Sequence, residues 1–111
     1  MSSVFERIIA GALPAEKVFE NERILAIQDI HPDAPVHVLI LPKKHFKDLN
    51  DVGPEDQALM GEIVLVAQQL AEKFGVEEGY RLVSNCGPMA GQTVFHLHFH
   101  LLGGRSLGAL G

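Results

Sequence analysis

In the largely apolar segment 36–42, the β-branched residues Val36, Val38 and Ile40 alternate with other residues, which predicts a β-strand. Residues 16–20 and 23–29 have the same character on either side of a short polar turn, and they predict two earlier strands. Residues 80–85 and 94–102 predict a fourth and a fifth strand near the end of the chain.

A different spacing occupies the middle of the chain. After Pro54, apolar residues recur every three or four positions, at Leu59, Ile63, Val66, Leu70 and Phe74. This single apolar stripe is typical of an amphipathic helix, which Gly75 ends. A shorter helix is expected at the start of the chain, capped by the serine at position 2 or 3 and running to about Ala10.

The predicted order is therefore a helix, three strands, a long helix and two strands. Because the first strands are joined by short links, we expect an antiparallel sheet with helices on one side, an α+β fold. The 111 residues suffice for one compact domain spanning residues 1–111. Their hydrophobic content of 47% is high for so short a chain and is consistent with burial of apolar surface against a second subunit.

Composition excludes several classes of protein. The net charge is −5 and the longest basic run is two lysines, so we expect no nucleic-acid partner and no anionic membrane partner. The single cysteine, Cys86, forms no intramolecular disulfide. Glu6 and Arg7 interrupt the first apolar stretch, so the sequence predicts no signal peptide, no transit peptide and a cytoplasmic location.

The most informative chemistry is a row of histidines at alternate positions, His96, His98 and His100. On a strand, alternate residues share one face, about 6–7 Å apart. Leu97, Phe99 and Leu101 then face a core on the other side. The row has three interpretations: a polar outer face that happens to use histidine, a set of zinc ligands, or a nucleophile with its acid and orienting groups.

Residues before the row favour the third interpretation. A glycine-containing loop, residues 87–91, is of the kind that turns backbone N–H groups toward an anion. Gln92, Thr93 and Asn85 supply polar groups nearby. Since the chain contains no Walker A or dinucleotide-binding glycine motif, a phosphate would be held by this loop and the histidines.

These residues carry a family resemblance. The string GQTVFHLHFHLLGGR, residues 91–105, resembles the motif of histidine triad proteins. The segments DIHPDAPVHVLILPKKH, residues 29–45, and FERIIAGALPAEKVFE, residues 5–20, resemble two further blocks of that family. The Gly103-Gly104-Arg105 ending and the chain length are similar to its Hint branch.

The resemblance implies a five-stranded antiparallel sheet with two helices, paired in a homodimer into one ten-stranded sheet. It also implies an enzyme, a nucleoside phosphoramidase that uses no metal ion and no other cofactor. Such an enzyme hydrolyses the P–N bond of purine nucleoside 5′-phosphoramidates, including aminoacyl-adenylate-like substrates. The expected partners are therefore purine nucleoside monophosphate derivatives and a second copy of the chain.

By position in the motif, His98 matches the nucleophile and His100 matches the histidine that contacts the phosphate and the leaving group. His96 and His37 match residues that complete the cluster, and Asp29 matches the acceptor of the ribose hydroxyls. Phosphate or leaving-group contacts are expected from Asn85, Gly91, Gln92 and Thr93. The apolar walls of the base pocket match Val4, Phe5, Ile8, Ile27, Ile30 and Leu39, which would otherwise be taken for ordinary core.

The sequence departs from the family pattern at a few positions. Met89 and Ala90 precede Gly91 where two consecutive glycines are common, and Thr93 stands where serine is frequent. Ser3 and Glu6 occupy the places of cysteines that bind zinc in some relatives, so no structural zinc is expected. His31 and His45 are interpreted as solvated, with His45 close enough in sequence to flank the site.

Three rival functions follow from the same residues. A metallohydrolase would use the histidines as metal ligands. A nucleotide-binding or scaffold protein would bind AMP with little catalysis. A dinucleoside polyphosphate hydrolase would share the nucleophile but take another substrate.

Overall fold

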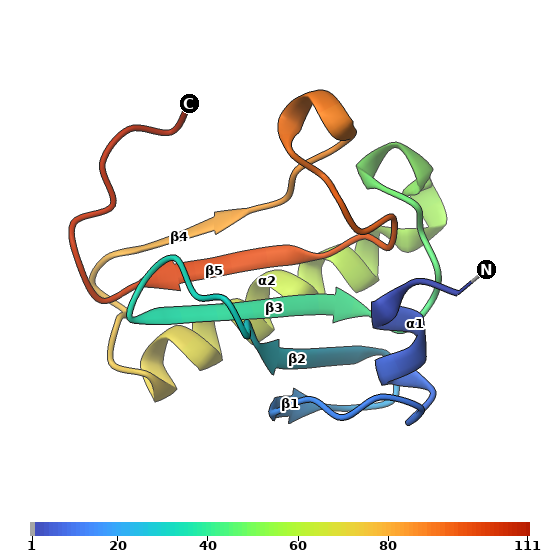
Figure 1. Ribbon diagram of the computed structural model, residues 1–111, viewed down its shortest axis with the longest axis horizontal. Helices are drawn as coiled ribbons and strands as arrows, with labels where there is room; N and C mark the ends of the chain where they lie inside the picture. Colours follow the sequence, from blue (N-terminus) through green and yellow to red (C-terminus); the bar gives the residue numbers. More distant parts are fainter. Residues whose placement is uncertain (1) are drawn as a thin grey trace.

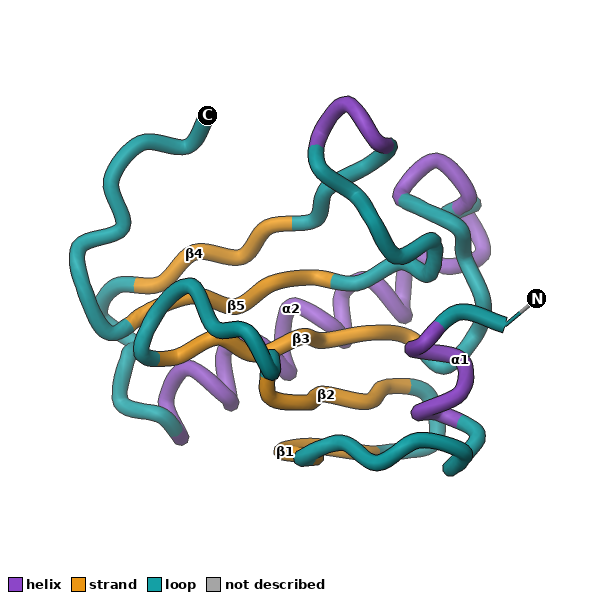
Figure 2. The backbone as a smooth tube through the Cα atoms, viewed as in Figure 1, coloured by secondary structure: helices purple, strands orange, loops and turns teal. Residues whose placement is uncertain are grey.

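The computed structural model describes residues 2–111 and contains one five-stranded sheet. Its strands are β1 (Lys17–Glu20), β2 (Ile24–Gln28), β3 (Val36–Pro42), β4 (Tyr80–Val83) and β5 (Phe99–Gly103). Every neighbouring pair is antiparallel, in the order β1-β2-β3-β5-β4 (Figure 1). The helices are α1 (Val4–Ile9) and α2 (Gln57–Lys73), and short 3₁₀ turns lie in the connecting segments (Figure 2). The predicted α+β fold with an antiparallel sheet is confirmed.

Local sequence explains where α1 begins. The Ser3 hydroxyl accepts a hydrogen bond from the Glu6 backbone N–H at 3.1 Å, and the Glu6 carboxylate accepts one from the Ser3 N–H at 3.0 Å. This reciprocal capping box satisfies two backbone donors that a helix N-terminus leaves free. The predicted serine cap, at position 2 or 3, is confirmed at Ser3, and Glu6 completes the capping box.

The two helices cover opposite faces of the sheet, so the prediction of helices on one side was wrong. Ile24 and Ala26 of β2 pack toward α2, whereas Leu25 and Ile27 of the same strand pack toward α1. A strand that is apolar on both faces needs a cover on each of them. Figure 1 shows α2 behind the sheet and α1 in front of it.

The apolar residues form one core on each face. The α2 side is the larger and contains Ile24, Ala26, Val38, Ile40, Ile63, Val66, Ala67, Leu70 and Leu101. The α1 side contains Phe5, Ile8, Leu25, Ile27, Leu39 and Leu41. The predicted apolar stripe of α2 faces the first core. No helix within residues 2–111 has the length and apolar character to cross a membrane.

The fifth strand is shorter than predicted and begins at Phe99 instead of residue 94. Its ladder with β3 ends at the Ile40–Phe99 pair, and the next steps of that register approach Pro42, which has no N–H to donate. Ser84, just after β4, uses its hydroxyl to donate to the His98 carbonyl at 2.8 Å. His96 and His98 therefore precede the strand, and only His100 lies on it.

Candidate active site

His37 and His100 form a hydrogen-bonded pair on the α1 side of the sheet. Leu39 of β3 pairs with His100 of β5, so His37 lies diagonally across from His100, and His37 Nε2 is 2.9 Å from His100 Nδ1. The Asp33 backbone N–H donates to His37 Nδ1 at 3.0 Å, so this nitrogen carries a lone pair. The neutral ring then has its proton on Nε2 and donates it to His100 Nδ1. His100 in turn keeps its own proton on Nε2.

His98 has the opposite tautomer. Its Nδ1 lies 2.7 Å from the backbone carbonyl oxygen of His96, and because a carbonyl only accepts, this nitrogen carries the proton. Nε2 of the neutral His98 ring therefore has a free lone pair. The ring centroids of His98 and His100 are 5.2 Å apart, so a ring with a free lone pair and a ring with an N–H donor are neighbours.

Burial favours the neutral forms of His98 and His100. Removal from water lowers the pKa of His98 below its ordinary value of 6.5. Burial also lowers the pKa of His100, and the rings of His98 and His37 add to the effect, bringing it to about 4. The edge of the Phe5 ring lies on the His98 ring with a centroid distance of 4.8 Å, which is part of this apolar cover.

His96 does not stand beside the other two as the alternation predicted. Its ring is fully buried, and its Nε2 donates to the Pro42 carbonyl oxygen at 2.7 Å. Its Nδ1 therefore accepts a hydrogen bond from Nδ1 of His45 at 3.3 Å. Burial lowers the pKa of His96. The structure thus places His96 in a supporting position, where its backbone carbonyl orients His98.

His45 is exposed, as the sequence predicted, and one edge of its ring joins a small network. His45 Nδ1 is 3.7 Å from a carboxylate oxygen of Glu6, in addition to its contact with His96. The network ties α1 to the segment before β5. Neither Glu6 nor His45 was assigned a role from the sequence, and only their nearness to recognisable motif residues could have indicated one.

Asp29 lies where the β2–β3 loop begins, next to the histidine pair. Its Oδ1 accepts the His31 N–H at 2.8 Å, and its Oδ2 is 3.4 Å from His37 Nε2. Its side chain is mostly buried but not closed off. A carboxylate has several acceptor positions, so these contacts leave others available.

The loop between β4 and β5 has a fixed shape. Gly91 adopts a left-handed conformation with φ of 95°, which a glycine adopts without strain. The buried Gln92 amide accepts from the Gly87 N–H and donates to the carbonyls of Lys47 and Val94. The Gln92 side chain therefore braces the loop from inside.

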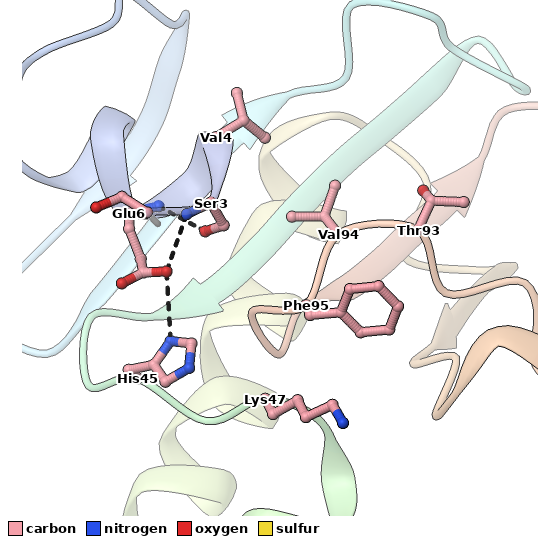
Figure 3. Close-up of a pocket in the computed structure, with 9 residues that line it drawn as sticks. Ser3, Val4, Glu6, His45, Lys47, Thr93, Val94 and Phe95 are labelled. Carbon is pink, nitrogen blue, oxygen red and sulfur yellow. Dashed lines mark hydrogen bonds and ion pairs between the residues drawn. The ribbon is translucent and has the colours of Figure 1, made fainter.

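Two cavities adjoin these residues. One of about 240 Å³ is lined by His37, His100 and Asn85, together with Asp33, Arg81, Val83, Leu102 and Leu110. The other, of about 570 Å³, contains Thr93 and Val4 and extends past Glu6, His45, Lys47 and Phe95 (Figure 3). Figure 3 also shows the Glu6–His45 contact at its edge.

The residues predicted to line a base pocket gather only in part. Phe5, Ile8, Ile27 and Leu39 pack together in the core under α1. Val4 lies beside them at the start of α1, on the rim of the larger cavity. Ile30 is 84% exposed in the β2–β3 loop and contributes to neither core.

Two groups of side chains have the composition of a metal site. Asp29, His37 and His100 form one, and Glu6, His45 and His96 form the other, each with its ligand atoms within 4.8 Å of one another. Ligands about 2.0–2.1 Å from a tetrahedral zinc lie about 3.3–3.4 Å apart. The 3.3 Å between His45 and His96 fits this spacing, whereas the 2.9 Å between His37 and His100 fits a hydrogen bond better.

With this geometry established, comparison with known proteins gives the class. The HIT domain family model matches residues 10–107. An uncharacterized HIT-like protein of Chlamydia trachomatis is 51% identical over 110 residues, 99% of each chain. A HIT family hydrolase from Legionella pneumophila Philadelphia 1 superposes with a TM-score of 0.94 at 47% identity, covering 96% of each chain. A histidine triad nucleotide-binding protein from Candida albicans superposes with a TM-score of 0.84 at 31% identity, covering 99% of this chain and 84% of that one.

The chain therefore belongs to the HIT family, and its sheet and helices match the fold of that family. The resemblance read from the histidine row and the two upstream blocks is confirmed. Assignment to the Hint branch stays a prediction.

Proposed function

We propose that this protein is a nucleotide hydrolase that cleaves the P–N bond of purine nucleoside 5′-phosphoramidates through a nucleotidyl-His98 intermediate. The observation that carries the proposal is the pair of opposite tautomers, a free Nε2 lone pair on His98 and an N–H on Nε2 of His100. A nucleophile and a hydrogen-bond donor 5.2 Å apart, centroid to centroid, suit attack at a phosphorus whose oxygens need a donor. The hydrolase named from Legionella supports the reaction class.

In the first step, Nε2 of His98 attacks phosphorus and a new N–P bond forms. The P–N bond to the amine breaks, its electron pair stays on the amine nitrogen, and that nitrogen takes a proton from Nε2 of His100. Because the resting His100 ring is neutral, it first takes up a proton from solvent, and an anionic phosphoryl group beside it favours this protonated form; giving the proton to the amine returns the ring to its neutral state. The positive charge that develops on His98 is stabilised by its Nδ1–H bond to the His96 carbonyl.

In the second step, water attacks phosphorus, the bond to His98 breaks and a proton returns to His100. The nucleoside monophosphate is released, His98 regains its free lone pair, and His100 regains its neutral state when this proton returns to solvent. His37 supports the cycle because it holds His100 in position. His96 supports it through the carbonyl that orients the nucleophile.

Further roles are proposed for the surrounding residues. Asp29 accepts the ribose hydroxyls, since its carboxylate lies beside His37. Asn85, which lines the cavity beside His37 and His100, and Thr93, which lines the larger cavity beside His45, contact the phosphate or the leaving group. Gly91 and Gln92 shape the loop that carries Thr93. The purine packs against Val4 on the cavity rim, against Phe5, Ile8, Ile27 and Leu39 under α1, and against Ile30, which is exposed in the β2–β3 loop.

The first experiment measures hydrolysis of an adenosine phosphoramidate with and without EDTA. We compare the wild type, His98→Ala, and His31→Ala as a control that removes an exposed histidine of the β2–β3 loop. EDTA-resistant turnover that disappears only in His98→Ala is the expected result, with a nucleotidyl adduct detected by mass spectrometry under neutral conditions. Turnover that persists in His98→Ala contradicts the nucleophile assignment.

The rival functions predict other outcomes. A metallohydrolase is favoured by the spacing of Glu6, His45 and His96, and it predicts stoichiometric zinc in the purified protein and loss of turnover in EDTA. A binding protein predicts AMP binding without turnover. Faster cleavage of a dinucleoside polyphosphate than of the phosphoramidate would point to the runner-up substrate.

We also propose that residues 1–111 act as one HIT domain that pairs into a homodimer. β4 is the last strand of the sheet, and within the described residues only β5 pairs with it. An unpaired strand edge is a template for pairing with another chain. Pairing of two β4 edges would give ten strands. Light scattering coupled to size-exclusion chromatography tests this: a monomer at micromolar concentration contradicts it.

A further inference from the structure

The Gly103-Gly104-Arg105 segment lies at the end of β5 and has no part in the proposed chemistry. It contacts the β2–β3 loop, which donates a hydrogen bond to the His37 ring. One guanidinium nitrogen of Arg105, Nη2, donates to the Asp33 carbonyl oxygen at 2.7 Å. Asp33 is the residue whose N–H donates to His37 Nδ1 at 3.0 Å. Arg105 therefore holds the residue that fixes the tautomer of His37.

Gly104 brings Arg105 into this position. Its φ of 97° lies in the left-handed region, where other residues are strained. A Cβ added at Gly104 would lie 2.9 Å from Cβ of Pro35, so the turn packs directly against the end of the β2–β3 loop. Only glycine satisfies both requirements. The turn and the loop thus meet at two points, Gly104 against Pro35 and Arg105 on Asp33.

We propose that Arg105 is a positioning residue that sets the proton position on His100 through Asp33 and His37. The connection consists of three consecutive hydrogen bonds, of 2.7 Å from Arg105 to Asp33, 3.0 Å from Asp33 to His37 and 2.9 Å between His37 and His100. With Asp33 held, Nδ1 of His37 is occupied as an acceptor and its proton must lie on Nε2. His100 then accepts at Nδ1 and presents Nε2–H on its other side.

Release of Asp33 would remove the hydrogen bond to Nδ1 of His37, and the Asp29 Oδ2 contact at 3.4 Å would be the remaining interaction that favours a proton on Nε2. The loop has only a few other anchors, among them the Asp29 Oδ1 bond to the His31 N–H and the Asp29 N–H bond to the His37 carbonyl oxygen. Without the Asp33 N–H, His37 is free to carry its proton on Nδ1. Its Nε2 then accepts, so His100 must turn its proton toward His37 and lose it from the side that faces the substrate.

The test uses the full-length variants Arg105→Ala and Arg105→Lys, with Arg23→Ala as the matched control. Arg23 is also exposed and makes two hydrogen bonds, but to Glu62 and away from the histidines. The first readout is long-range ¹H–¹⁵N NMR of histidine-labelled protein at pH 7.5, which distinguishes Nδ1–H from Nε2–H rings. We expect Nε2–H on His37 and His100 in the wild type and in Arg23→Ala, and a new Nδ1–H population in Arg105→Ala.

The second readout is steady-state hydrolysis of an adenosine phosphoramidate, and this arm rests on the proposed function. We expect kcat to fall about tenfold in Arg105→Ala while KM changes less than twofold, with partial rescue in Arg105→Lys, because the donor is lost but the nucleotide contacts remain. Unchanged tautomers in Arg105→Ala would overturn the proposal, and changed tautomers with wild-type kcat would overturn the expected link between the tautomers and turnover. If the wild type turns over no phosphoramidate, the proposed function fails, while the NMR result still decides whether Arg105 sets the tautomers.

Discussion

Acid should destabilise this fold through the buried histidines, and His100 allows the effect to be sized. Burial, with the nearby rings of His98 and His37, lowers the pKa of His100 to about 4, while in the unfolded chain an ordinary histidine titrates near 6.5. Between these values the unfolded chain binds a proton that the folded chain does not. Stability is therefore complete above pH 6.5 and is lost as the pH falls toward 4.

The magnitude follows from the same two values. The free energy of unfolding is then about 2 kcal/mol lower at pH 5 than at pH 8, because the pKa of His100 is 6.5 in the unfolded chain and about 4 in the folded chain. Because His100 is only partly buried, solvent screening reduces this to about 1 kcal/mol. His98 and His96 act in the same direction, since burial lowers the pKa of both.

Urea unfolding followed by circular dichroism at pH 8 and pH 5, at constant ionic strength, measures this loss. Between pH 5 and pH 8 the carboxylates whose pKa is lowered stay ionised, so they do not contribute to the change; these are Glu6, Glu20, Asp56 and Glu62. When the pH falls from 8 to 5, the free energy of unfolding of His100→Gln should decrease by about 1 kcal/mol less than that of the wild type. His31→Gln should behave as the wild type. Two protein concentrations separate this effect from dissociation of a dimer. Equal losses in His100→Gln and the wild type would refute the reasoning.

Three further substitutions test the packing that supports the site, each by urea unfolding. Gly103→Ala should lower the free energy of unfolding by about 1–3 kcal/mol, because the new Cβ would lie 2.9 Å from Cβ of Val76. An unchanged urea midpoint would mean that Val76 moves aside freely. Gly61→Ala, on the exposed face of α2 with open space around it, should instead stabilise the protein by about 0.5–1 kcal/mol. Gln92→Ala should cost about 1–3 kcal/mol and lower kcat as well, because it leaves three backbone groups of the loop without their partner; wild-type kcat would show that the loop does not need this brace.

Local pattern predicted the parts of the fold that depend on nearby residues. The strand at Val36–Pro42 was predicted with its observed bounds, and the cap at Ser3 was recognisable because capping needs only a few adjacent residues. The start of β5 was missed because it depends on Pro42, a residue more than fifty positions away that cannot donate to the ladder. Both faces of β2 are apolar, which the sequence displayed, but placing α1 opposite α2 required the packing itself.

In the candidate site too, the sequence predicted the residues, whereas the position of each proton depends on contacts that only the fold creates. The motif identified His98 and His100, but their protonated nitrogens are set by the partners of His98 and His37, the carbonyl of His96 and the N–H of Asp33. Two side chains of the same type thereby acquire opposite capacities, one to attack and one to donate. Burial favours the neutral, lone-pair form of His98 that the proposed attack needs, and the Phe5 ring of α1 is part of that burial. Placing α1 on the face opposite α2 is therefore what allows a histidine near the surface of a small sheet to keep its lone pair free at neutral pH.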